Sequence, residues 1–244
     1  MCYSKNMVID RVDYEYPQAK MYRDQRSGFL KRLRFPFWTQ FYETHTQTIF
    51  EKGGKIVDIG GGLRIDIARG NRINQHHVKK FGHFLSNSNV NYIVTDYTDK
   101  YSPDSVEDIH DLSFESDSID AIFCNAVLEH VYDPKKATSE LVRVLKRGGS
   151  ALLYAPFIYR YHAHSEDYKD YYRYTKDVIA YLFRECRSIE ICPVRGIFES
   201  LLRFLPIHKI TLIRYSMRML DTFIPPIRRI SESQTSGYHI FITK

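Results

Sequence analysis

Residues 55–62 constrain the fold of this chain more than any other stretch, because a short apolar run there ends in Asp58 and is followed by three glycines. A continuous apolar run of this length is typical of a parallel strand buried on both faces. Glycines directly after such a strand permit a tight turn and let a ligand approach the backbone closely. The stretch therefore predicts an α/β sheet that holds a nucleoside-containing ligand at this strand end.

Further apolar segments continue the pattern, and helical periodicity lies between most of them. The expected strands are residues 55–59, 91–95, 105–109, 119–124, 149–155, 188–192 and 237–243. A first helix is expected over 35–50 and another begins at Thr175. Between them, a helix should begin after the N-cap residue Asp133 and stop at Gly148 and Gly149. Alternating strands and helices predict a parallel sheet with helices on both faces.

Length and composition favour one globular α/β domain with additions. The chain has 244 residues, of which 43% are apolar and 26% charged, so a sizeable core is expected. The four cysteines show no metal-ligand spacing, and neither a disulfide framework nor a signal peptide is evident, so we expect a cytoplasmic protein. We divide it into a basic N-terminal extension, residues 1–34, and a domain over 35–244, with a helical cap inserted at 196–230.

Charge and histidine patterns indicate the partner class. The net charge is +6, and basic residues concentrate in 17–34 and 196–230. Solvated faces are one explanation, and attraction to a phosphorylated substrate, a polyanion or a membrane surface is the other.

His76 and His77 lie in a long segment between the first two strands without a carboxylate or cysteine to complete a metal site. We therefore expect no metal.

The glycine loop alone could serve NAD, FAD, another nucleotide or S-adenosylmethionine. It lacks both the G-x-G-x-x-G register and a P-loop lysine. A series of motifs in this order resembles the class I S-adenosylmethionine-dependent methyltransferases. The motifs are 58–62 (Asp-Ile-Gly-Gly-Gly), 92–96 (Tyr-Ile-Val-Thr-Asp), 108–114 (Asp-Ile-His-Asp-Leu-Ser-Phe), 118–131, which ends in Leu-Glu-His-Val, and 143–149 (Arg-Val-Leu-Lys-Arg-Gly-Gly).

This resemblance implies a Rossmann-like fold with a seven-stranded, mostly parallel sheet whose last strand is antiparallel. It implies S-adenosylmethionine as cofactor and S-adenosylhomocysteine as product. Asp58 is expected to fix the turn, Asp96 to accept from the ribose hydroxyls and Asp108 to accept from the adenine amino group. The full set of expected cofactor residues is Asp58, Gly60, Gly61, Gly62, Asp96, Asp108, Ile109 and Asn125.

Residues 156–175 supply the candidate acceptor side and resemble a methyltransferase subgroup associated with surface-polysaccharide, capsule and glycan biosynthesis. The candidate catalytic residues are His162, His164 and His130, and the candidate substrate-binding residues are Tyr159, Tyr172 and Arg173. A histidine near neutral pH can act as a base, or can only order the loop or form the pocket wall. Arg173 can hold an anion in a fork, or can pair with Asp170 and brace the loop.

The leading functional hypothesis is O-methylation of a sugar, a nucleotide-sugar, a phosphorylated small molecule or a glycan end, with an anionic acceptor favoured. A phosphate or phosphoramidate oxygen and an amine stay open as acceptors. One alternative is a nucleotide-dependent oxidoreductase, which requires a parallel last strand. The other is a methyltransferase-like module that binds a membrane or nucleic acid. We expect a monomer or homodimer with no nucleic-acid partner, and peripheral membrane contact is a further hypothesis.

Overall fold

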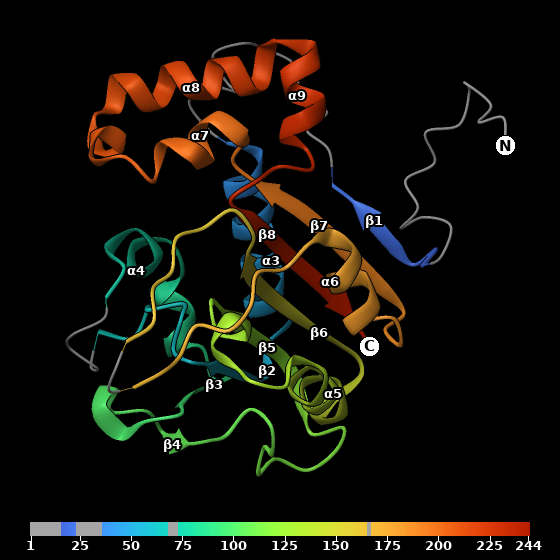
Figure 1. Ribbon diagram of the computed structural model, residues 1–244. Coiled ribbons are helices and arrows are strands. Elements are labelled where there is room, and N and C mark those ends of the chain that lie inside the picture. Colours follow the sequence, from blue (N-terminus) through green and yellow to red (C-terminus); the bar gives the residue numbers. More distant parts are fainter. Residues whose placement is uncertain (1–15, 23–35, 68–72, 165–166) are drawn as a thin grey trace, which may run out of the picture.

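The computed structural model describes residues 16–22, 36–67, 73–164 and 167–244, and within them the strands form one eight-stranded sheet (Figure 1). The strands are β1 (Ala19–Met21), β2 (Gly54–Ile59), β3 (Val90–Asp96), β4 (Ser105–Val106), β5 (Ile119–Asn125), β6 (Leu145–Pro156), β7 (Ser188–Val194) and β8 (Gly237–Thr243). Their order is β1-β7-β8-β6-β5-β2-β3-β4. β8 runs antiparallel to both β6 and β7, and the other pairs are parallel.

The predicted sheet is confirmed, including its antiparallel last strand. That strand excludes the parallel edge on which the oxidoreductase alternative depended. All seven predicted strands form, although β4 keeps only two of the five predicted residues. An eighth strand, β1, pairs with β7 beyond the predicted edge. Its three residues are too few to show an alternating pattern in the sequence.

Helices lie between most of the strands in the sequence. They are α3 (Phe37–Lys52), α4 (Gln75–Phe81), α5 (Pro134–Val144), α6 (Lys176–Leu182), α7 (Ile197–Leu202), α8 (Thr211–Phe223) and α9 (Pro225–Ser231), with short 3-10 helices η2 (Gly82–Ser86), η3 (Asp99–Tyr101), η4 (Leu128–His130) and η5 (Pro206–Lys209). Asp133 and Thr175 cap α5 and α6 as predicted. The prediction that Gly148 stops α5 is wrong: the helix ends at Val144, because Leu145 is already extended and pairs with Ile119.

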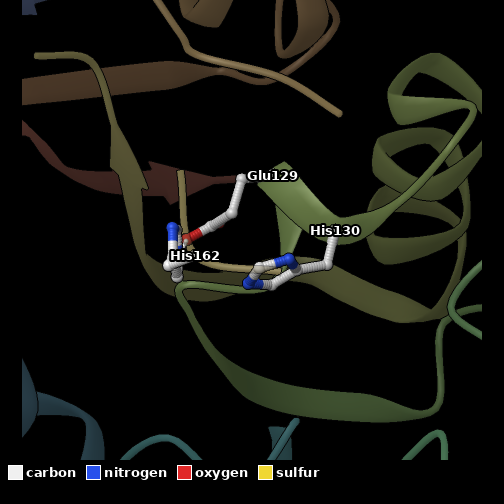
Figure 2. A group of neighbouring side chains, drawn as sticks. All are labelled: Glu129, His130 and His162. Atoms are coloured by element: carbon white, nitrogen blue, oxygen red, sulfur yellow. Dashed lines mark ion pairs between the residues drawn. The ribbon is translucent and has the colours of Figure 1, made fainter. Parts of the chain in front are cut away.

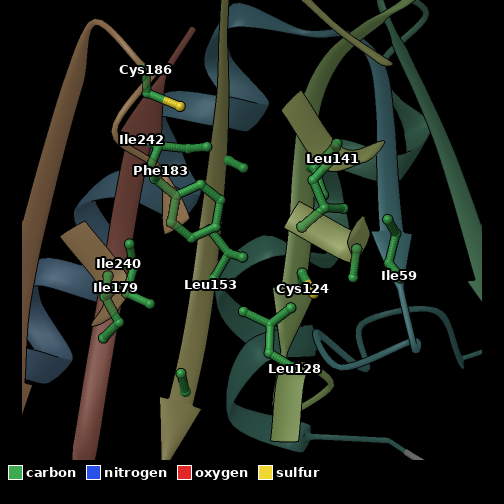
Figure 3. Packing of buried hydrophobic residues seen from close by; sticks show 14 of the residues in the cluster. Ile59, Cys124, Leu128, Leu141, Leu153, Ile179, Phe183, Cys186, Ile240 and Ile242 are labelled. Carbon is green, nitrogen blue, oxygen red and sulfur yellow. The ribbon is translucent and has the colours of Figure 1, made fainter. Parts of the chain in front are cut away.

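Neighbouring residues of each central strand point to opposite faces of the sheet, and a separate core covers each face. On one face, Ile122 and Leu153 belong to a core with apolar residues of α5 and α6. Figure 3 shows Leu153 in this core together with Leu141 of α5 and Ile179 of α6. On the other face, Phe123 and Leu152 pack with apolar residues of α3 and α4. Burial on both sides explains why these strands read as continuous apolar runs.

The segment 196–230 forms helices, of which η5 begins at Pro206 and α9 at Pro225, as expected, whereas η5 and α8 are separated at Ile210. α7, α8 and α9 lie together at one end of the molecule (Figure 1). The buried carboxylate of Asp221 in α8 accepts the amides of Phe198 and Glu199 at 3.0 and 2.9 Å. Glu199 in turn pairs with Arg218 at 2.7 Å. The segment therefore has its own polar network, while its boundaries as a separate unit stay a prediction.

No helix in the described ranges is long and apolar enough to cross a membrane. Most of the basic stretch 17–34, and with it most of the predicted extension 1–34, lies outside the described residues.

Candidate active site

A cavity of about 870 Å³ lies at the carboxyl ends of the parallel strands, within the range of about 300–1,000 Å³ typical of small-molecule sites. Ligands bind at this edge in open α/β sheets. The structure brings most of the predicted site residues together here. Those lining the cavity are Gly60, Gly62, Asp96, Asp108, Ile109, Asn125, His130, Tyr159 and His162.

The strand order divides this cavity into two halves. The predicted cofactor residues follow β2, β3 and β4, which are neighbours on one side of β5. The predicted acceptor residues Tyr159 and His162 follow β6, on the other side of β5. Asn125 and His130 come from the end of β5 and the turn after it, so they lie between the halves. One cavity can thus hold two ligands that meet above β5.

Asp58 lies beneath the glycine turn and does not face the main cavity. With Gly61 it lines a separate space of about 30 Å³. Its carboxylate accepts the amides of Gly62 and Leu63 at 3.1 and 2.9 Å and the hydroxyl of Tyr92 at 2.7 Å. Burial raises the pKa of Asp58 to about 6, although these hydrogen bonds oppose the rise. Asp58 therefore shapes the loop from behind.

The approach of Gly62 to Asn125 leaves room only for glycine. A Cβ atom on Gly62 would lie 2.7 Å from the Cβ of Asn125 and 3.0 Å from its carbonyl oxygen. The Asn125 amide nitrogen donates to the Tyr42 hydroxyl at 2.9 Å. Its Oδ1 atom is buried and has no hydrogen-bond partner among the described residues. An acceptor without a partner on the cavity wall fits a ligand that brings a donor, such as an ammonium or hydroxyl group.

Acidic residues and the apolar Ile109 line the end near β3 and β4. Asp96 closes β3, where an acid can accept from both hydroxyls of a ribose. Asp108 Oδ1 accepts from the amide and ring of His110 at 2.9 and 2.7 Å. Burial would raise the pKa of Asp108, but the hydrogen bonds and charge of His110 lower it. Ile109 is buried beside them and offers an apolar wall for a flat ring.

His162 is held in one orientation by groups on both sides of its ring. Its Nδ1 atom lies 3.1 Å from the Arg160 carbonyl oxygen and 3.2 Å from Asp170 Oδ2. Its Nε2 atom lies 3.6 Å from Oε1 of the buried Glu129. The Glu129 carboxylate raises the pKa of His162, against the opposite effect of burial.

Three predicted residues support the acceptor loop from outside the cavity. In the part of the chain that the structure describes, His164, Tyr172 and Arg173 do not line it. Arg173 forms a fork to Asp170 at 2.5 and 2.8 Å and also donates to backbone carbonyls. His164 lies 3.1 Å from Asp167, and the Tyr172 hydroxyl donates to the Tyr132 carbonyl at 3.1 Å. These contacts match the bracing alternative for Arg173.

Sequence reasoning missed Glu129, Arg195 and Arg203, all of which line the cavity. Arg195 follows β7 with φ of 66°, a strained backbone for a residue other than glycine. Glu129 occupies the second position of the Leu-Glu-His-Val motif, which was the one available signal. Nothing in the sequence around Arg195, just before the segment 196–230, or around Arg203 within it distinguishes them from the neighbouring basic residues.

Comparison with known families decides the enzyme class. Residues 66–153 match a family model described as a methyltransferase domain, and the match includes Asp96, Asp108 and Asn125. The chain is an S-adenosylmethionine-dependent methyltransferase. Its cofactor is S-adenosylmethionine and its product is S-adenosylhomocysteine. No curated protein sequence matches this methyltransferase.

Three solved structures are similar to most of this methyltransferase. A SAM dependent methyltransferase from Archaeoglobus fulgidus is 14% identical, with 88% of this chain and 98% of that chain covered and a TM-score of 0.50. One from Mesorhizobium loti is 13% identical, with 87% and 100% covered and a TM-score of 0.47. Phosphoethanolamine N-methyltransferase 2 from Haemonchus contortus, in complex with S-adenosyl-L-methionine, is 15% identical, with 91% and 61% covered and a TM-score of 0.45. Likeness at this identity to the Archaeoglobus structure shows the fold alone.

Proposed function

We propose that this methyltransferase methylates a hydroxyl group on a small anionic acceptor, a sugar phosphate, nucleotide-sugar or related intermediate of glycan biosynthesis. The observation that carries the proposal is a pair of arginines, Arg195 and Arg203, that line the same cavity as the expected cofactor residues. The resemblance of residues 156–175 to the glycan-associated subgroup supports the sugar part of the acceptor.

The two arginines carry positive charge that their neighbours neutralise incompletely. Arg195 Nε lies 3.9 Å from Glu199, but Glu199 accepts from Arg218 at 2.7 and 3.0 Å. Burial, followed by the nearby charge of Arg203, lowers the pKa of Arg195. A phosphate or carboxylate between the two guanidinium groups would relieve this repulsion through charge-assisted hydrogen bonds.

The cofactor end has the opposite charge. Asp96, Glu107 and Asp108 line it, so acidic groups meet the ribose and the adenine amino group. When bound, S-adenosylmethionine supplies a methyl group activated by its sulfonium. We assign Gly60 and Gly62 to the close backbone approach and Asn125 Oδ1 to a donor on the cofactor. An anionic acceptor is thereby directed toward the arginine end.

The acceptor hydroxyl has to lose a proton, and His162 is the group we place beside it. Glu129 and Asp170 lie on opposite sides of this imidazole and fix its ring. Tyr159 lines the cavity next to it, with ring centroids 5.2 Å apart. His130 lies beside His162 in the same wall, with centroids 4.9 Å apart. We assign His164, Tyr172 and Arg173 to ordering the acceptor loop, through the contacts described above.

The experiment is a screen of matched acceptors with S-adenosylmethionine, in which release of S-adenosylhomocysteine is measured and the product is identified by mass spectrometry. Each pair consists of a neutral sugar and the same sugar as a phosphate or nucleotide conjugate. We expect turnover only with the anionic member, and methylation of a carbon-bound hydroxyl. Turnover of neutral sugars alone, or a methyl group on nitrogen or on phosphate, would contradict the proposal.

We also propose that the surface of residues 201–214 rests on an anionic membrane face, which places the enzyme at the inner side of a membrane. Six apolar residues there are exposed among the residues that the structure describes: Leu201, Phe204, Leu205, Ile207, Ile210 and Leu212. Leu212 is 76% exposed. Basic residues, Arg203, Lys209 and Arg214, are interspersed with no acidic residue. Apolar side chains combined with positive charge favour a lipid surface over a neutral protein partner.

A further inference from the structure

We infer that Glu129, His130 and His162 form a binding site for one divalent transition-metal ion on the acceptor side of the cavity. Glu129 and His130 are consecutive residues of η4, and both side chains point toward His162 on the loop after β6 (Figure 2). One ligand atom of each residue lies within 4.8 Å of the ligand atoms of the other two. All three line the cavity.

The Glu129 carboxylate is buried and has few polar partners among the described residues. Glu129 is only 1% exposed, and its Oε2 atom has no hydrogen-bond partner anywhere in the described ranges. Among the described residues, its other oxygen has one polar contact, at 3.6 Å to His162. A buried carboxylate without a full set of partners is costly, and metal coordination is one of the few ways to compensate it. The Oε2 atom of Glu129, which has no hydrogen-bond partner among the described residues, therefore independently supports an ion at this position.

Both imidazoles are already held in the form that a metal requires. His130 Nδ1 lies 2.6 Å from the carbonyl oxygen of Lys169, which can only accept, so this nitrogen carries the proton. His162 Nδ1 faces the Arg160 carbonyl oxygen and the Asp170 carboxylate in the same way. In the neutral form of each ring, the lone pair is therefore on Nε2. Metal-binding histidines typically donate their second ring nitrogen to such a carbonyl or carboxylate.

The donor set selects the class of ion. Two imidazoles and one carboxylate suit borderline ions such as Fe²⁺, Co²⁺ or Zn²⁺, whereas Mg²⁺ and Ca²⁺ prefer oxygen alone. Bonds of about 2.1 Å in a tetrahedral arrangement set neighbouring donors about 3.4 Å apart, so a pair now 4.8 Å apart would have to close by about 1.4 Å when the ion binds. Three protein ligands leave coordination positions open toward the cavity.

The role of the ion rests on the proposed function. An ion at this point would bind the acceptor through a hydroxyl oxygen, lower the pKa of that hydroxyl and let its proton pass to water in the cavity. His162 then acts through the ion, because the ion and a proton compete for the same Nε2 atom. Neither the spacing of these residues nor the cysteine and histidine pattern indicates the site in the sequence, because Glu129 and His162 are brought together only by the loops after β5 and β6.

The test is calorimetric titration of the chelator-treated, full-length protein with Co²⁺, together with the visible absorption spectrum of the bound ion. Neither cofactor nor acceptor is present, so the result is independent of whether the proposed acceptor is correct. We expect one equivalent per chain. Glu129→Gln and His162→Gln should weaken binding by more than the roughly 10–100-fold typical of a lost outer-shell partner, and Asp170→Asn by an amount within that range.

The matched control is His76→Gln. His76 is exposed and lies 2.8 Å from Glu43, so it offers a competing imidazole and carboxylate on the surface. We expect this variant to bind Co²⁺ like the wild type. Binding that is absent in the wild type, or that Glu129→Gln leaves unchanged, overturns the inference, and so does binding lost only in His76→Gln. Affinity for S-adenosylhomocysteine, measured on every variant, shows that each is folded.

Discussion

The hydroxyl of Tyr92 donates to Asp58 Oδ2 at 2.7 Å, so a side chain of β3 fixes the acid that shapes the turn after β2. The same carboxylate receives the amides of Gly62 and Leu63. It lies under the turn and not on the cavity wall, and its pKa is raised to about 6 by burial. The shape of the expected cofactor loop thus depends on a buried network that spans two strands.

Replacement of Asp58 by asparagine should weaken binding of S-adenosylhomocysteine by roughly tenfold or more. The asparagine side chain would direct an N–H toward one of the groups that now donate to Asp58. A buried donor left without a partner costs about 1–3 kcal/mol. Tyr92→Phe should have a smaller effect, because the two backbone amides still reach Asp58. Titration calorimetry measures both. Equal affinity in Asp58→Asn and the wild type would show that the loop keeps its shape without this acid.

Gly62→Ala should abolish measurable cofactor binding, because the new Cβ would meet Asn125 at 2.7 Å and push the loop or the end of β5 out of place. Gly82→Ala is the matched control. Its added Cβ would find its nearest neighbour at 3.5 Å, an ordinary contact. We expect Gly82→Ala to bind S-adenosylhomocysteine like the wild type. Similar affinities for the two variants would contradict the close approach at Gly62.

Asp170→Asn should lower the free energy of unfolding by about 2 kcal/mol at pH 7. The fork from Arg173 lowers the pKa of Asp170 from 3.8 to about 2, with burial opposing and the His162 amide assisting. The ionised carboxylate therefore stabilises the fold above pH 3.8, and this contribution is lost as the pH falls toward 2. Urea unfolding at several pH values should show the difference between variant and wild type shrink through this window. A difference that stays constant with pH would assign it to packing.

Arg203→Gln should raise the KM for the acceptor by roughly tenfold to hundredfold, the size expected for a lost charged hydrogen bond. We expect kcat to change little, and affinity for S-adenosylhomocysteine to stay at the wild-type value, because Arg203 is assigned to the acceptor half. Arg184→Gln, at the end of α6 and outside the cavity, serves as the control. A change in cofactor affinity in Arg203→Gln would show that this arginine belongs to the cofactor half of the cavity and not to the acceptor half.

The wild-type protein should sediment with vesicles that contain anionic lipid, and less so as salt concentration rises. The double change of Phe204 and Leu212 to aspartate should remove most of this binding. Val106→Asp is the control, since Val106 is also exposed but lies on β4. Wild-type protein that stays in the supernatant would refute membrane contact. A molecular mass that rises with protein concentration in the wild type but not in the double variant would show that this surface binds a second copy of the chain.

The sequence predicts the sheet well because central strands buried on both faces produce unmistakable apolar runs, as Ile122 and Phe123 show from opposite faces of β5. It also locates most residues that line the cavity near β2, β3 and β4, because they lie at strand ends that can be recognised in the sequence, while their role in binding the cofactor stays a prediction. The acceptor half is harder to predict. Arg195 and Glu129 belong to loops after β7 and β5, and the loop paths that bring them to one cavity leave no periodic signal.

The pairing of β1 with β7 has a practical consequence for work on this protein. A shortened version that starts at residue 36 would keep every residue assigned to chemistry, yet would leave the backbone N–H and C=O groups along the outer side of β7 open to other chains. Exposed strand edges of this kind promote aggregation. Good behaviour in solution therefore depends on a segment that takes no part in methyl transfer.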